Sequence, residues 1–344
     1  MVRFFRVSIL SGLCSVAVGL LYSCSSSVRE VDYVALQADK SIEQFSDSTF
    51  FGNVSCLIGY GDDIYVSDKK RCQIFRLDTA LNLLATIGSQ GHGPQELGYV
   101  SYFSIDRDTL FVGDPTKLQI LRFAPDGSFL ESEDPDKTLP LNHRFGVKDN
   151  HIYYESTKYI EDGNTLVDYD RGASELKHKP FGRFENFGYP IKNIEQNRRD
   201  VHLYGDRIVV VPLSIPTVEI YDRNTLELIR SVDISEVPVV WDMYQKMTSN
   251  REILENPNVA YMLFLDSYLH DDRLYIAVSI YSDDRLDHSV LLEFDLSKGG
   301  AEWVRQYDFP EWTDRICVTD DYIYGFVPTY SSIKRYPKPK TTDR

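Results

Sequence analysis

The stretch that decides the fold is residues 54–87, which read VSCLIGYGDDIYVSDKKRCQIFRLDTALNLLATI. It contains four short apolar runs, at 54–58, 64–67, 73–77 and 83–87, and turn-forming residues separate them. Short runs rich in β-branched and aromatic side chains, bounded by turn formers, are typical of β-strands. We therefore expect four consecutive strands that pair antiparallel through hairpins.

The same pattern recurs along the chain. A tight acidic or Gly turn followed by an apolar and aromatic strand occurs at six places, centred on Ile64, Leu110, Ile152, Ile208, Leu274 and Ile323. The spacings between these centres are 46, 42, 56, 66 and 49 residues. A period in the forties, with insertions, is the length of a four-stranded propeller blade. The sequence therefore predicts an all-β fold, a six-bladed β-propeller of four-stranded antiparallel blades.

The sixth copy of the pattern is incomplete. Its three strands, at 316–318, 323–327 and 333–336, are followed by residues 337–340, PKPK, which cannot continue as a paired strand. We expect residues 31–36 to supply the missing strand, so that an N-terminal strand closes the last blade and no sheet edge stays open. On this interpretation residues 31–344 form a single propeller domain.

Two copies and the link between them carry a family resemblance. Residues 64–77 and 110–127 resemble NHL-type blades. Residues 87–97, IGSQGHGPQEL, resemble the Gly-rich G-x-G-x-G-P-x-E segment of six-bladed propeller lipoproteins of Gram-negative bacteria. The chain is thus similar to the NHL/TolB-like propeller lipoproteins, with its sharp motifs within 55–130. The resemblance implies the fold and a lipid anchor, and it brings no catalytic residues.

The N-terminus predicts export. Two arginines precede an apolar stretch at 7–22 that is too short to span a bilayer, so residues 1–23 are predicted to be a signal peptide. Residues 21–24, LYSC, resemble a lipobox, although its tyrosine departs from the pattern. We expect Cys24 to be acylated and residues 24–30 to form a polar tether. The alternative is an ordinary signal peptide with an incidental cysteine. The expected location is the outer membrane, on its periplasmic or surface side, with the lipid as the only membrane contact.

Charge and residue spacing exclude several function classes. The net charge of −15 argues against a nucleic-acid surface, because phosphate binding requires clustered Lys and Arg. Cys56, Cys72 and Cys317 are odd in number and lack CxxC spacing, so we expect buried thiols and no disulfide or zinc site. The seven histidines show no HxH or HExxH spacing, and no G-x-S-x-G motif is present. We predict no metal, no cofactor and no catalytic residue, and a monomeric protein.

Loop lengths favour one face of the propeller. The strands of a blade, A to D, run from the axis outward, so A–B and C–D turns share one face, here called the short-turn face. The D-to-A links and B–C loops share the other, here called the insertion face. All long insertions belong to the insertion face. They are the D-to-A links 88–100, 181–199 and 234–262 and the B–C loops 158–165 and 282–287. Binding sites are commonly built on long loops, so we expect the ligand there and no room for a pocket on the short-turn face.

The candidate ligand-binding residues on the insertion face are Asp68, His92, Glu96, Asp114, Arg183, Phe184, Phe187 and Trp241. Each has a structural alternative. Asp68 and Asp114 end adjacent B strands and would suit acid–base chemistry or loop capping. The Gly-rich link would be a site or a connector. The aromatic residues of 181–189 would stack on a sugar or peptide, or pack under the loop. A helix predicted over 241–256 would be a lid or a packed element.

We interpret the protein as a non-catalytic ligand- or protein-binding or scaffolding propeller on a lipid anchor in the cell envelope. Its ligand would be a small molecule, a glycan or a protein at the insertion face. The alternative is a propeller enzyme, a lyase, glycosidase or lactonase. An enzyme should show a compact polar cluster with shifted pKa values, whereas a binder should show aromatic and neutral polar loops.

Overall fold

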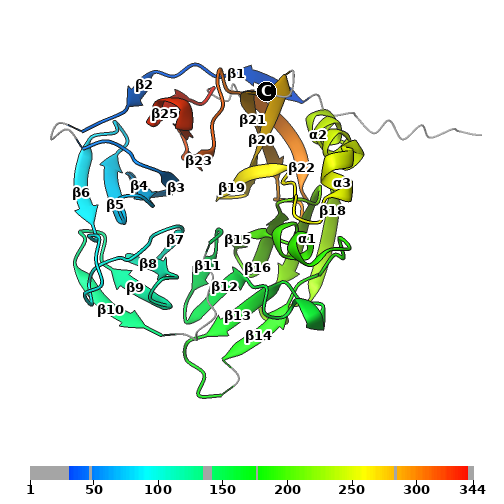
Figure 1. Ribbon diagram of the computed structural model, residues 1–344. Coiled ribbons are helices and arrows are strands. Elements are labelled where there is room, and N and C mark those ends of the chain that lie inside the picture. The colour runs from blue at the N-terminus through cyan, green and yellow to red at the C-terminus, as the bar shows by residue number, and fades with distance from the viewer. Residues whose placement is uncertain (1–30, 46–48, 135–141, 176, 283–284, 340–344) are drawn as a thin grey trace, which may run out of the picture. The chain divides into compact units, whose positions relative to one another are not determined.

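The computed structural model describes residues 31–45, 49–134, 142–175, 177–282 and 285–339. In this part of the chain six sheets surround a central axis (Figure 1). The first three blades consist, from the axis outward, of β3 (Val54–Tyr60), β4 (Asp63–Asp68), β5 (Gln73–Asp78) and β6 (Leu83–Ile87); β7 (Phe103–Asp106), β8 (Thr109–Asp114), β9 (Gln119–Phe123) and β10 (Phe129–Glu133); and β11 (Gly146–Lys148), β12 (His151–Glu155), β13 (Leu166–Asp170) and β14 (His178–Phe181).

The other three blades follow the same order. They consist of β15 (Arg199–Tyr204), β16 (Arg207–Pro212), β17 (Thr217–Asp222) and β18 (Leu228–Asp233); β19 (Phe264–His270), β20 (Arg273–Ser282), β21 (Arg285–Asp295) and β22 (Glu302–Asp308); and β23 (Arg315–Val318), β24 (Tyr322–Val327) and β25 (Ser332–Pro337). Among these strands, neighbours within a blade pair antiparallel. The predicted six-bladed all-β propeller is confirmed.

The recurring sequence pattern corresponds to the B strand of each blade. In β4, β8, β16 and β24 every residue after the first is buried. A B strand has a paired strand on each edge, and both faces of its blade pack against neighbouring blades. The apolar core accordingly lies between blades, as in the cluster formed by blades five, six and one. A strand that is buried on both faces reads as a continuous apolar run, which is why this strand was readable in all six copies.

An N-terminal strand closes the last blade, as predicted, but the predicted residues were wrong. Strand β2 (Lys40–Ile42) pairs antiparallel with β25 and is the fourth strand of blade six. Strand β1 (Asp32–Ala35), the segment expected in that position, instead pairs parallel with β22 as a fifth strand of blade five. The register is fixed on both blades, because Arg335 donates two 2.9 Å hydrogen bonds to the Asp39 carboxylate and the Leu36 amide donates to the Asp308 carbonyl.

Most long insertions lie on the insertion face as expected. The link from blade three to four contains α1 (Pro190–Glu195), and the link from blade four to five contains α2 (Pro238–Ser249) and α3 (Arg251–Glu255). The predicted long loop at 282–287 is wrong, because β20 and β21 extend into a long hairpin there. The helix expected over 241–256 is divided, since Asn250 adopts an extended conformation and its side chain caps α3.

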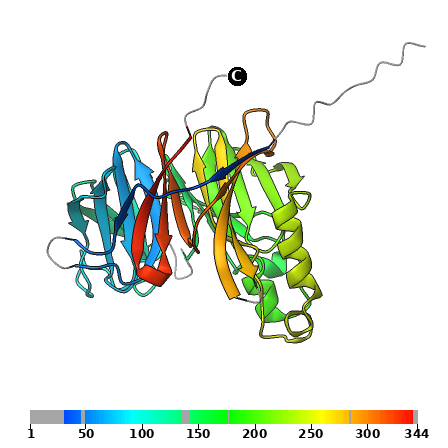
Figure 2. The same ribbon diagram turned by 90° about the horizontal axis from the view of Figure 1, so that it is seen from above.

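Both ends of the described chain lie at the short-turn face. Strand β1 runs parallel to β22, a D strand, so it begins where the C–D turns are. Strand β25 runs antiparallel to β24 and ends beside the A–B turn of blade six, where the Lys338 amide donates to the Asp321 carbonyl. Figure 2 shows the blue start and red end of the described chain on the side opposite the helices. None of the described helices combines the length and apolar sequence needed to cross a bilayer.

Candidate functional site

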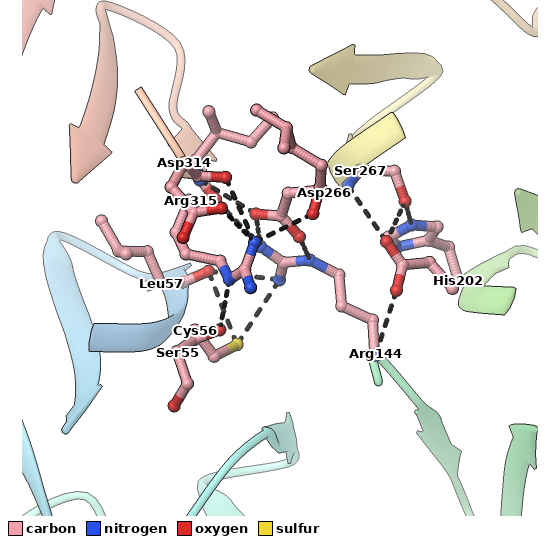
Figure 3. A network of polar contacts seen from close by, with 12 residues as sticks. Ser55, Cys56, Leu57, Arg144, His202, Asp266, Ser267, Asp314 and Arg315 are labelled. Atoms are coloured by element: carbon pink, nitrogen blue, oxygen red, sulfur yellow. Dashed lines mark hydrogen bonds and ion pairs between the residues drawn. The ribbon is translucent and has the colours of Figure 1, made fainter. Parts of the chain in front are cut away.

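A buried arginine closes the middle of the channel (Figure 3). Arg144, just before β11, is only 6% exposed. Its Nε and Nη2 donate to the two oxygens of Asp266 at 2.7 Å each. The same guanidinium donates to the carbonyls of Leu57 at 3.2 Å and Ile316 at 2.9 Å. These partners belong to blades one, five and six, so this side chain from blade three ties four blades together at the axis.

A hydrogen-bonded chain of three residues continues from this centre. Asp200 Oδ2 accepts from the Ser267 amide at 3.1 Å and lies 2.8 Å from Ser267 Oγ. Ser267 Oγ in turn lies 2.7 Å from Nε2 of His202. Burial, with the nearby Asp266 carboxylate, raises the pKa of Asp200 to about 6. Burial and then the Arg144 charge lower the pKa of His202 to about 3, so the imidazole is neutral at pH 7.

On the short-turn side of Arg144 the channel widens into a cavity of about 320 Å³. The A strands of blades one to five form its walls, and Arg144 forms its floor. Its lining combines partly exposed apolar residues such as Ile58 and Ile105 with the polar residues Tyr60, Asp106, Lys148 and His202. The expectation that this face has no room for a pocket is therefore wrong, because the space lies between the A strands and does not depend on loop length.

On the insertion side the channel end is filled by charged groups. Arg198 donates from Nε and Nη2 to the two oxygens of Glu195 at 2.6 and 2.7 Å, and its Nη1 lies 2.6 Å from Nε2 of His143. The carboxylate of Glu155, 3.9 Å from the same His143 nitrogen, is buried. The ring of Tyr102 stacks on His143, with 6.1 Å between ring centroids. We call these five residues the mouth cluster.

The environment shifts two pKa values in the mouth cluster. Burial, followed by the positive charge of Arg198, lowers the pKa of His143 to about 3. Burial raises the pKa of Glu155 to about 7, and the nearby Arg198 opposes this shift without cancelling it. Sequence reasoning missed these residues, because Tyr102, His143 and Arg198 lie in three separate D-to-A links and only the ring of blades brings them together.

Asp68 and Asp114 occupy equivalent capping positions in blades one and two. The carboxylate of Asp68 accepts from the backbone amides of Gly52, Asn53, Lys70 and Arg71 at 2.5–3.1 Å. That of Asp114 accepts from the amides of Gly98, Thr116 and Lys117 and from the Thr116 hydroxyl, at 2.6–3.3 Å. Both side chains are buried. This geometry matches the loop-capping alternative, since the oxygen atoms are occupied by backbone donors.

The Gly-rich link between blades one and two is held in one conformation by its own side chains. Glu96 accepts a 2.7 Å hydrogen bond from the Gly93 amide, and Lys117 donates to the carbonyls of Gly93 and Glu96 at 2.7 and 2.5 Å. A Cβ atom at Gly91 would lie 2.0 Å from Glu96 Oε2, so a larger residue there would displace the Glu96 side chain from this brace. His92 is exposed beside this brace. The contacts favour the connector alternative for this link.

The second predicted group lies around α1 and α2. Arg183 and Trp241 are exposed, and Phe184 and Phe187 are half-buried. The link that carries the phenylalanines is braced by two side-chain amides, since Asn193 accepts from the Phe187 amide at 2.7 Å and Asn197 bonds the backbone of residue 185. These four residues therefore lie on the insertion face, at a distance from Asp68 and Asp114 along the ring of blades.

Exposed apolar side chains gather on the helices of this face. We call α1, α2 and α3 the helical cap. Its exposed members and flanking residues are 38–49% accessible: Tyr189, Ile191, Ile194, Trp241, Leu254 and Met262. Helices α1 and α3 are in contact, because Lys192 Nζ donates to the carbonyls of Ile253 and Leu254 at 2.5 and 3.0 Å.

The remaining candidates are smaller. The thiols Cys56, Cys72 and Cys317 are free and buried, and burial raises the pKa of Cys56 to about 11. On the short-turn face, donor atoms of His270, Asp271 and Asp320 lie within 4.8 Å of one another, and the two carboxylates are exposed. Cys24, the predicted lipidation site, lies outside the described residues.

Comparison with known proteins supports the fold. A family model described as a 6-bladed beta-propeller (DUF5128) matches residues 22–285. A candidate exported protein of Bacteroides fragilis is 14% identical with a TM-score of 0.56, and the match covers 91% of this chain and all of that one. A member of the DUF4221 family from Bacteroides vulgatus is 11% identical, also at 0.56, with 90% and 98% covered. No curated protein matches the chain.

Proposed function

The chain belongs to the 6-bladed beta-propeller family, and from this membership and the geometry above we propose that it is an exported, lipid-anchored binding protein of the cell envelope. It is a non-catalytic propeller of the NHL/TolB-like lipoprotein kind, held in the outer membrane through acylated Cys24. Its partner is a protein that binds the helical cap on the insertion face.

The observation that carries this proposal is the concentration of exposed apolar side chains on the helical cap. Trp241, Leu254 and Met262 are each 49% accessible although the fold offers a large core between its blades. Clustered exposed apolar residues mark interaction sites, and Trp, Tyr and Met are enriched in protein interfaces. The cap therefore fits a protein surface better than a small ligand.

The direction of the chain supports the same arrangement. The first described strand begins at the short-turn face, and Val31 follows Cys24 by only seven positions. An extended chain of that length reaches about 25 Å. An anchor at Cys24 thus holds the short-turn face close to the membrane and leaves the helical cap on the side that faces away from it. The name of the Bacteroides fragilis neighbour, a candidate exported protein, supports export.

Site-specific photo-crosslinking in cells tests the binding surface. A photoreactive amino acid at position 241 or 254 should give a crosslinked product of defined mass, because both side chains are exposed on the cap. The same amino acid at position 206, in an A–B turn of the short-turn face, is the matched control. Products that form at 206 and are absent at 241 and 254 would contradict the proposal.

Metabolic labelling tests the anchor. Labelled palmitate should enter the wild-type protein and be lost in Cys24→Ala, which should then be soluble or retain its signal peptide. Cys14→Ala is the control, because Leu13 before it is a poor match to a lipobox. Undiminished labelling of Cys24→Ala would show that the anchor lies elsewhere or is absent.

One observation favours the enzymatic alternative, a lyase, glycosidase or lactonase. Burial places the pKa of Glu155 at about 7 beside a neutral His143, and a carboxyl group that titrates near the working pH suits general acid–base catalysis. If the mouth cluster is catalytic, turnover of a glycan or lactone should fall roughly 100-fold or more in Glu155→Gln. Glu252→Gln, on the exposed surface of α3, should have no effect. Turnover unchanged in Glu155→Gln excludes the mouth cluster as its source.

A further inference from the structure

The cavity on the short-turn face is not explained by a partner that binds the opposite face. It has a volume of about 320 Å³, within the range of small-molecule sites. Its floor is the Arg144–Asp266 pair, and five A strands surround it. The cavity thus has rigid walls that belong to the propeller framework.

The hydrogen bonds around Ser267 fix which nitrogen of His202 carries the proton. Ser267 Oγ donates its single hydroxyl proton to Asp200 Oδ2 at 2.8 Å. Because that proton is committed, Ser267 Oγ must accept from Nε2–H of His202, which lies 2.7 Å away. His202 is neutral, so its Nδ1 is a hydrogen-bond acceptor, and no described residue donates to it. His202 is one of the residues that line the cavity, so Nδ1 is the acceptor that this side chain has left for a ligand.

The charges of the cavity are balanced. Arg144 at the floor is paired in a bidentate manner with Asp266. The other ionic residues of the lining, Asp106 and Lys148, are opposite in sign and lie at the ends of β7 and β11, where the cavity opens. A charged ligand would lose its hydration without meeting an unpaired counter-charge inside. The site therefore favours a neutral molecule.

The walls offer many hydrogen-bonding groups. Each A strand is the terminal strand of its sheet, so the amide and carbonyl groups of its inner edge have no partner strand and face the channel. The partly exposed side chains of Ile58 and Ile105 lie among them. Backbone donors and acceptors next to apolar side chains suit a molecule that carries both hydroxyl groups and apolar C–H faces.

We propose that this cavity binds a small, neutral, polyhydroxylated molecule of monosaccharide size, with one ligand hydroxyl donating to Nδ1 of His202. Apolar side chains of the lining, such as Ile58 and Ile105, contact the C–H face of the ligand, and the strand edges bond its other hydroxyl groups. This site is separate from the helical cap, and Arg144 lies between the cavity and the insertion face.

Titration of the folded protein with neutral hexoses tests the proposal. Glucose, galactose and mannose would be added at pH 7 while the ring nitrogens of His202 are followed by ¹⁵N NMR. At least one sugar should bind and shift the Nδ1 signal, with Nε2 still protonated. His202→Leu should weaken binding roughly tenfold or more, the effect of about 1.4 kcal/mol. His270→Leu, at the end of β19 on the same face but outside the lining, should change it less than about twofold.

Charged analogues of the same sugars sharpen the test. Glucuronate and glucosamine should bind more weakly than the neutral hexoses, because Arg144 at the floor is already paired with Asp266 and the two ionic residues at the opening have opposite charges. The proposal is overturned if no neutral hexose shifts the His202 signals, if His202→Leu binds as tightly as the wild type, or if a charged analogue binds more tightly than its neutral parent. The NMR measurement on the wild-type ring decides the question even where a substitution impairs folding.

Discussion

The two ends of the channel are formed by the same inner strands and differ in what occupies them. At the short-turn end the A strands enclose a cavity whose charges are balanced. At the insertion end the mouth cluster places polar and ionisable side chains over the axis, including Glu155, whose pKa burial raises to about 7. The difference arises because D-to-A links can place extra side chains over the axis, whereas two-residue turns cannot. The long links thus supply the side chains that occupy the insertion end, whereas the space at the other end is set by the A strands themselves.

Arg144 separates the two ends of the channel, and its substitution should cause the largest loss of stability. Arg144→Leu leaves the buried Asp266 carboxylate without its counter-charge and should lower the free energy of unfolding by about 3–5 kcal/mol. Denaturant unfolding followed by tryptophan fluorescence measures this change. The comparison is with Arg107→Leu, which removes an exposed pair with Asp149 at the short-turn face and should cost about 0–1 kcal/mol. Equal losses would show that the central pair is no more important than a surface one.

Removal of the strand that closes the ring of blades should cause the next largest loss of stability. A variant that starts at residue 37 loses β1 but keeps four strands in every blade. A variant that starts at residue 44 also loses β2 and exposes the edge of β25. The second should melt at a clearly lower temperature, by roughly 5–10 °C if β2 contributes about 2–3 kcal/mol, and should aggregate more readily. Equal melting temperatures in differential scanning calorimetry would show that blade six does not need β2.

The smallest effect concerns the pH dependence of the mouth cluster. The pKa of Glu155 is raised from 4.5 to about 7 on folding. Between these values the folded protein holds a proton that the unfolded chain has released, so stability from this group falls as pH rises from about 4.5 to 7. As pH rises across that interval, the free energy of unfolding of Glu155→Gln should therefore increase by about 1–3 kcal/mol relative to that of the wild type. His143, whose pKa is lowered to about 3, contributes a slope of the opposite sign in both proteins.

Denaturant unfolding at pH 5 and pH 8 gives this difference directly. Glu252→Gln, exposed on α3, is the control and should not change the difference between the two pH values. If the difference in free energy of unfolding between Glu155→Gln and the wild type is the same at both pH values, Glu155 does not change its proton affinity on folding.

The blades were predictable from sequence and the channel contents were not. The B strands are continuous apolar runs with tight turns before them, so Ile64 and its five counterparts were recognised locally. Arg144, Asp266 and His202 meet only because blades three, four and five surround one axis, and nothing in their spacing indicates this. The exchange of β1 and β2 has a similar cause, since both segments are short and polar enough to pair with either open strand edge.

The parallel pairing of β1 with β22 has a mechanical consequence for an anchored protein. A pull on the N-terminus along the strand would shear β1 against β22. The force would then act on all the hydrogen bonds between residues 32–35 and 305–308 at the same time and would not break them one after another. The Asp32–Arg305 ion pair, at 3.1 Å, lies at the loaded end of this strand pair. Resistance to such a pull is governed by the rate of unfolding. If the chain is anchored at its N-terminus as proposed, β1 is the strand that would bear the tension.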